Sequence, residues 1–251
     1  MSRSNPTANA QNPATRWFEW NGETGTIRYY DKDAKANRDV NLPFTFLLLD
    51  QLGGVGGWHE ASKSSIYSNA VRDTRQDVLI VKAFKGGTLA EGIYQNIKAH
   101  VTSKAVGGYF ITTCYVAVKD KDNGLSIAGL KFKGSALGAW MEFQKAHRQE
   151  LYEQAITITG FHEGQKGRIV FRVPTFALKP VSGETQAAAV GLDRQLQAYL
   201  ESYLSRTKTE QVEQPHVPVE PSSEPPPPPD DDPYGTGEDD RFHADDDDIP
   251  F

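Results

Sequence analysis

Basic and aromatic side chains recur two residues apart in several segments of this sequence. In residues 77–85 (DVLIVKAFK), Lys82 and Phe84 fall on one face of a strand, while Leu79 and Val81 fall on the other. Cations suit phosphate groups and aromatic rings suit bases, so this spacing predicts a groove for an unpaired nucleic acid strand. The residues expected to contact single-stranded DNA are Arg28, Tyr30, Trp58, Tyr67, Arg72, Arg75, Lys82, Phe84, Lys131, Lys133, Arg168 and Arg172.

Any single pair is better explained by an ordinary strand that turns its charges to water. Three further pairs also share one face of a strand, namely Arg28 with Tyr30, Lys131 with Lys133, and Arg168 with Arg172. This repetition favours the groove. Aromatic residues in strands more often fill a core, and we expect this of Phe44, Phe46, Phe132 and Trp140.

The end of the chain is a second candidate binding element. It consists of Asp245, Asp246, Asp247, Asp248, Ile249, Pro250 and Phe251. Ile249 and Phe251 are suited to an apolar pocket of another protein, where a basic residue would bind the terminal carboxylate. Pro250 restricts φ and lowers the ordering cost, and the aspartates would steer association. We therefore predict a partner-binding tip at residues 245–251.

No group of residues in the sequence supports a catalytic site. The glycine-rich residues 53–57 (GGVGG) lack the Lys-Ser/Thr of a phosphate-binding loop and are predicted to be a flexible connection. Asp120, Asp122 and Asn123 resemble the start of a calcium loop without its glycine and glutamate spacing. Cys114 lies in an apolar segment and is predicted to be a buried structural thiol. We expect no enzyme activity, no metal and no cofactor.

Charge divides the chain into two unequal parts. Residues 1–209 contain 26 Lys and Arg against 19 Asp and Glu, whereas residues 210–251 contain one Arg against 14 acidic residues. A basic body with an acidic tail is typical of a polyanion-binding surface joined to a solvated interaction segment. The single cysteine and the absence of a signal segment or a long apolar run predict a reducing, cytoplasmic location.

Strand patterns dominate the part that must position these side chains. A hairpin is predicted around Asn21-Gly22, and further strands at 42–49, 77–85, 109–119, 125–133, 155–161 and 167–173. Helices are predicted from the capping-box spacing at Thr88 to Val101, after Ser135, and from about Gln186 to Leu204. This order predicts a mainly β fold with helices, in which an OB-fold-like closed barrel carries added strands and a C-terminal helix.

Four regions follow from these patterns and from the composition. They are a disordered N-terminal arm at 1–15, an OB-fold-like DNA-binding domain at 16–205, a disordered linker rich in Pro and acidic residues at 206–244, and the tip at 245–251.

The tip sequence DDDDIPF closely resembles the C-terminal tip of bacterial single-stranded DNA-binding proteins. In that family the tip docks on clamp-loader, primosome, helicase, nuclease and recombination-mediator proteins. The body is similar to bacteriophage-type single-stranded DNA-binding proteins over about residues 17–175, in the segments PFTFLLLDQL, IYSNAVRDTRQDVLIV and KFKGSALGAWMEF. The resemblance implies an OB-fold that coats single strands; homotetramers are usual in the bacterial group, and monomers or dimers in many phage proteins.

We therefore expect a protein that coats and protects single-stranded DNA during replication, recombination and repair, and that recruits partners through its tip. Its expected location is the bacterial cytoplasm, whether the gene is bacterial or phage-borne. Two alternatives stay open: an acidic-tailed adaptor or DNA mimic that binds the same partner pockets without coating DNA, and a strand-annealing protein. A preference for RNA also stays open, because stacking and phosphate contacts hardly discriminate the sugar.

Overall fold

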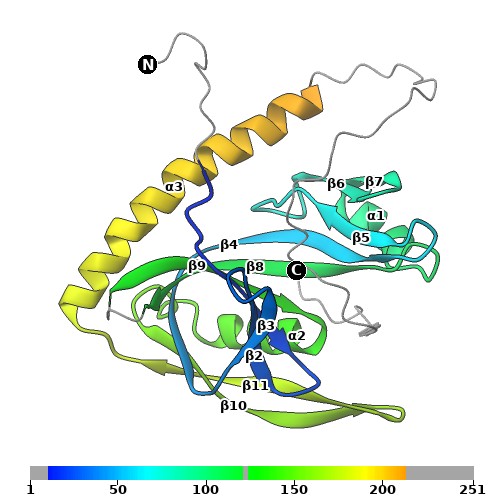
Figure 1. Ribbon diagram of the computed structural model, residues 1–251. Helices are drawn as coiled ribbons and strands as arrows, with labels where there is room; N and C mark the ends of the chain where they lie inside the picture. Colours follow the sequence, from blue (N-terminus) through cyan, green and yellow to red (C-terminus); the bar gives the residue numbers. More distant parts are fainter. Residues whose placement is uncertain (1–10, 121–123, 213–251) are drawn as a thin grey trace.

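The computed structural model describes residues 11–120 and 124–212, with side chains described as far as Ser205 (Figure 1). Within these residues the chain forms eleven strands and three helices. The strands are β1 (Trp17–Asn21), β2 (Thr26–Asp31), β3 (Ala36–Val40), β4 (Phe44–His59), β5 (Ser64–Ser68), β6 (Val78–Ala83), β7 (Gly87–Ile93), β8 (Gly108–Lys119), β9 (Leu125–Lys133), β10 (Ala155–Lys166) and β11 (Ile169–Lys179). The helices are α1 (Tyr94–Val101), α2 (Gly134–Ala146) and α3 (Gly183–Val212).

Strand β4 connects all parts of the sheet. Its 16 residues pair with β10 at Phe44–Phe46, with β8 over Leu47–Gly57 and with β5 over Gly56–His59. The main sheet has the order β3-β2-β1-β9-β8-β4-β5-β6-β7, and β10 carries β11 on its other side. Figure 1 shows β4 and β8 crossing the molecule together, with the smaller strands arranged around them.

The largest core surrounds Trp140 on α2. The Trp140 ring is completely buried and lies 5.1 Å from the Phe132 ring and 5.4 Å from the Phe176 ring, measured between centroids. Phe44 and Phe46 of β4 belong to the same cluster. The prediction that Phe44, Phe46, Phe132 and Trp140 are core residues is therefore confirmed.

The two faces of the β4–β8–β9 sheet are covered differently. Alternate residues of β8 point to opposite sides, so that Cys114 and Val116 join the α2 core while Tyr115 and Ala117 meet α3. A third cluster packs α1 against β6. It lies on the same face of the sheet as the α2 core, because Phe110 packs against both clusters. Helix α3 covers one end of the opposite face, where Leu196 and Leu200 are fully buried. The rest of that face carries the candidate site described below.

Several predicted elements are confirmed. β1 and β2 form the antiparallel hairpin predicted around Asn21-Gly22. β9 pairs along its whole predicted length with residues 111–119 of β8. Their connection lies partly outside the described residues, which exclude Asp122 and Asn123. The mainly β class, the added strands and the C-terminal helix are also confirmed. The predicted closed ring is not formed, because among the described strands β3, β7 and β11 each pair on one side only.

The prediction of a flexible connection at residues 53–57 is wrong. This glycine-rich stretch is the interior of β4 and pairs with β8 without interruption. A β-carbon on Gly57 would lie 2.4 Å from the carbonyl oxygen of Gly107, and one on Gly56 would lie 2.4 Å from Cδ1 of Ile111. The glycines therefore allow close approach of neighbouring groups in a regular strand.

The helix predicted from Thr88 begins later than expected. Gly87–Ile93 is strand β7, paired with β6, and α1 starts at Tyr94 without a side-chain cap. Pairing with β6 outweighs the local capping-box pattern in this segment. The apolar spacing predicts the buried side of this helix correctly, since Tyr94, Ile97 and Val101 are the buried residues of α1.

The ends of the domain are more ordered than predicted. Residues 12–15 were predicted to belong to a disordered arm, but the backbone N–H of Thr15 donates to the carbonyl of Ile127 at 2.8 Å, and Ala14 packs against the α3 core. At the other end α3 continues to Val212, beyond the predicted limit at Leu204. The predicted arm at 1–10 and the tip at 245–251 lie outside the described residues.

Replacing Gly57 with alanine should destabilise the fold, because the new methyl group would meet the backbone of Gly107. We expect the G57A variant to lose about 1–3 kcal/mol of unfolding free energy, as overpacked sites do. Gly138 is the matched control, because it lies exposed on α2 and a methyl group added there would meet no neighbouring side chain within 4 Å. G138A should gain about 0.5–1 kcal/mol from helix propensity. Urea unfolding of both variants checks this, and equal midpoints would contradict it.

Candidate nucleic-acid interface

A row of paired residues crosses the open part of the sheet from β8 to β6. Tyr109 pairs with Gly56, Gly56 pairs with Tyr67, and Tyr67 pairs with Lys82. Residues directly opposite each other in antiparallel strands project to the same face. Two tyrosines and a lysine therefore stand on one face, and the side chain of Ile111 on β8 reaches over Gly56.

A second row of aromatic residues lies beside the first. Trp58 pairs with Ser65, whose carbonyl accepts a hydrogen bond from the N–H of Phe84 at 3.0 Å. The exposed fractions of Trp58, Tyr67 and Phe84 are 39%, 48% and 46%. Such values are high for large aromatic side chains, which usually lie in the core. We call Trp58, Tyr67, Lys82, Phe84 and Tyr109 the platform.

The platform matches the alternation predicted for residues 77–85. Leu79, Val81 and Ala83 are buried, the first two against α1, while Lys82 and Phe84 face outward. The predicted residues Trp58 and Tyr67 join them through the β4–β5 and β5–β6 pairings. Sequence reasoning missed Tyr109, because its place beside Gly56 depends on the register between β4 and β8.

The same face continues through β9 to a basic cluster. The Nζ atom of Lys133 lies 5.4 Å from the Tyr109 ring and 2.6 Å from Oε1 of Glu19. The Nζ atom of Lys131 lies 5.2 Å from the Trp17 ring. We call Glu19, Lys131 and Lys133 the basic cluster; it brings two predicted contact residues together with a carboxylate that was not predicted.

Burial acts differently on the two lysines. It lowers the pKa of Lys131 to about 8, against an opposing effect of Glu19 and with a contribution from the charge of Lys133. Burial also disfavours the charge of Lys133, but the adjacent Glu19 carboxylate and Tyr109 outweigh it and hold the pKa of Lys133 above its ordinary value. Lys133 is thus a fixed cation, whereas Lys131 loses its proton in mildly alkaline solution.

Two predicted residues of β2 lie at the far edge of this face. Arg28 is in register with Glu19, and its Nε atom lies 3.8 Å from Oδ1 of Asp39. Tyr30, two residues along the strand, shares the face of Arg28. Both therefore border the basic cluster, two strands away from Lys131.

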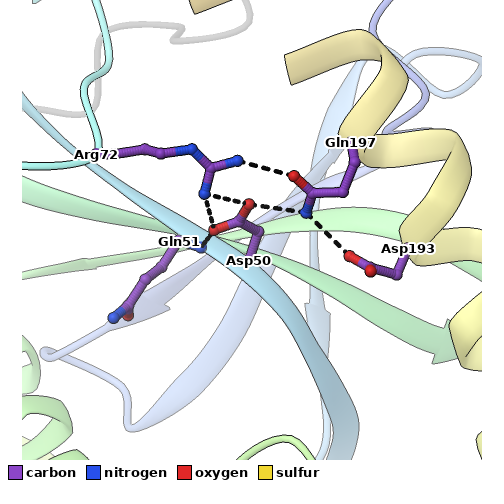
Figure 2. Close-up of polar contacts among 5 residues, drawn as sticks. All are labelled: Asp50, Gln51, Arg72, Asp193 and Gln197. Carbon is purple, nitrogen blue, oxygen red and sulfur yellow. Dashed lines mark hydrogen bonds and ion pairs between the residues drawn. The ribbon is translucent and has the colours of Figure 1, made fainter. Parts of the chain in front are cut away.

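Arg72 has a structural position (Figure 2). Its Nη1 lies 2.8 Å from Oδ2 of Asp50, and its Nη2 donates to Oε1 of Gln197 on α3 at 2.8 Å. Gln197 in turn donates to Asp50 and to Asp193, both at 3.0 Å. A shift of register after Leu48 turns Asp50 toward α3. The buried Asp50 carboxylate thus joins α3 to the segment between β5 and β6.

The remaining predicted arginines lie away from the platform. Arg75 pairs with Asp73 in its own loop, at 3.2 Å. Arg172 donates through Nη1 to the carbonyl of Glu23 and through its backbone N–H to that of Gly22, which fastens β11 to the β1–β2 turn. Arg168 precedes β11 in the β10–β11 turn, and β10 meets β4 only at Phe44–Phe46, the end opposite to Trp58. The structure does not bring Arg168 and Arg172 to the platform.

Three other features can be checked in the described residues: a reactive cysteine, a metal site and a membrane-spanning helix. Cys114 is completely buried, and burial together with the charge of Asp50 raises the pKa of its thiol far above the ordinary value. Within residues 11–120 and 124–212 no three His, Cys, Asp or Glu side chains are grouped so that they could hold a metal ion. None of the helices in the described part is long and apolar enough to cross a membrane.

No known protein family, curated protein or solved structure matches this chain.

Replacing Arg72 with alanine should destabilise the protein, because the buried Asp50 carboxylate would lose its cation. We expect a loss of about 1–3 kcal/mol in the unfolding free energy. The control R75A removes an arginine that is 61% exposed and should change it by less than about 0.5 kcal/mol. Chemical unfolding of both variants checks this, and equal stability would show that Arg72 does not hold α3.

The lowered pKa of Lys131 gives a pH-dependent stability. The unfolded chain keeps this proton up to about pH 10.5, whereas the folded chain releases it near pH 8. Between these values the unfolded state binds more protons, so the contribution of Lys131 to the unfolding free energy should rise with pH. Unfolding curves of the wild type and K131M from pH 7.5 to 9.5 measure the difference. A parallel pH dependence of the two proteins would contradict the assignment.

Proposed function

We propose that this protein binds and coats single-stranded DNA through the platform and the basic cluster. The observation that carries the proposal is the exposure of Trp58, Tyr67 and Phe84 on neighbouring strands beside Lys82. Aromatic faces stack on bases of any sequence, and cations hold the phosphates between them. A face with this composition is suited to unpaired strands, whose bases are free to stack.

The spacing of the platform fits this use. Tyr109 and Tyr67 lie on strands separated by β4, so their backbones are roughly 10 Å apart at the usual strand spacing. The side chain of Ile111 fills the space above Gly56, so the rings themselves offer the stacking surfaces. Lys82 and Lys133 flank the two tyrosines at the ends of the row. A strand bound across the sheet would place its phosphates near these two lysines.

We also propose that the tip recruits partner proteins. The sequence 245–251 ends in two apolar side chains and a carboxylate after an acidic run, and it resembles the tip of bacterial single-stranded DNA-binding proteins. Coating by the domain and recruitment by the tip would serve replication, recombination and repair in the cytoplasm. The proposal includes no catalytic step.

A titration with a fluorescent oligo-dT tests the central claim. The full-length protein should bind the single strand with an affinity that falls steeply with salt, and should bind a duplex of the same length more weakly. Absence of single-strand binding in dilute buffer would contradict the proposal and would favour an adaptor that uses its tip alone.

Replacing Tyr67 with alanine should weaken oligo-dT binding by about 1–3 kcal/mol, since it removes one stacking face. F84A should have an effect of similar size. Y152A is the control, because Tyr152 is 51% exposed but lies near Asp50, Arg72 and α3. This end of the face is away from the platform, since Asp50 is six residues from Gly56 along β4. Fluorescence anisotropy at fixed salt measures all three affinities. If Y152A weakens binding as much as Y67A, the platform is not the stacking surface.

A further inference from the structure

Glu19 is an acidic side chain in the most basic part of the candidate interface. It pairs in register with Arg28 on β2 and with Lys131 on β9, and its Oε1 lies 2.6 Å from Nζ of Lys133. Lys133 therefore contacts the carboxylate directly, and Arg28 and Lys131 flank Glu19 on the two neighbouring strands. Its side chain is 34% exposed, so a solute can reach it.

The cluster needs an anion for a simple electrostatic reason. Lys131 and Lys133 are two residues apart on the same face of β9, and the charge of each opposes the charge of the other. Both side chains are only partly exposed, so water screens this repulsion less than it would at a fully exposed surface. A carboxylate beside Lys133 relieves this repulsion in the free protein.

A phosphodiester has the same charge as a carboxylate and also binds through its oxygens. On a strand lying along the row from Lys82 to Tyr109, the next phosphate would arrive at Lys133, which already contacts the Tyr109 ring. Two anions would then compete for the same ammonium group.

We infer that Glu19 is an internal competitor for a backbone phosphate at Lys131 and Lys133, and that it sets the affinity and the salt dependence of strand binding. The inference rests on the proposed function and adds a specificity-determining residue to it. In the free protein Glu19 occupies the place of the phosphate. In the complex the phosphate takes over the contact with Lys133, and no covalent bond changes.

Substitution of Glu19 by glutamine tests the inference, because it removes the charge and keeps the shape. In the full-length protein, E19Q should bind oligo-dT about 2- to 5-fold more tightly at moderate salt. This factor corresponds to the free energy of the exposed ion pair that the phosphate no longer has to break. The plot of log affinity against log salt should become steeper by about 0.7, the change for one more phosphate neutralised on a single strand.

Glu142→Gln is the matched control. It makes the same change in net charge on an exposed position of α2, on the other side of the sheet. Screening should keep its affinity and its salt slope at the wild-type values. Glu19→Thr, which suits a strand, provides a second uncharged variant if E19Q unfolds.

The outcomes separate the two proposals. If E19Q and E142Q both behave as the wild type while the wild type binds oligo-dT, the inference is wrong and the proposed function stands. If E19Q binds more weakly, Glu19 positions Lys133 for DNA and is not a competitor. If neither the wild type nor the variants bind, the proposed function fails and the inference fails with it.

Discussion

The pairing of β4 with β8 is the constraint on which the rest of the structure depends. Both strands are long, and each contributes to two different faces, one covered by α1 and α2 and the other partly covered by α3. Since side chains alternate along a strand, the residues that bury one face determine which residues the other face exposes. The buried Val55 and the partly buried Phe110 thus leave Gly56 and Tyr109 on the open face.

Glycine has an unusual role in this pairing. Gly56 and Gly57 lie inside a regular strand, where neighbouring atoms occupy the space that side chains would need. The missing side chain at Gly56 makes room for Ile111 beside the row that runs from Tyr109 to Tyr67. A residue type that is usually unfavourable in strands therefore gives the candidate interface its shape.

Basic residues alone do not define the interface, because several of them are already engaged within the protein. Arg72 neutralises Asp50 and connects α3 to the sheet, and Arg172 fastens β11 to the β1–β2 turn. Lys133 is paired too, but with a carboxylate that is itself partly exposed on the open face. The difference between a structural cation and an available one lies in the burial and position of its partner.

The sequence by itself determined most of the strand segments, the core aromatic residues and the alternation that turns Lys82 and Phe84 outward, because these follow from local periodicity. It could not determine that residues 53–57 are a strand or that Gly87–Ile93 pairs with β6, since long-range pairing outweighs local glycine and capping signals. The meeting of Tyr109 with Tyr67, and of Glu19 with Lys133, was decided by tertiary structure alone. Such contacts depend on the register between strands far apart in the chain, and a shift of one residue would turn every side chain to the other face.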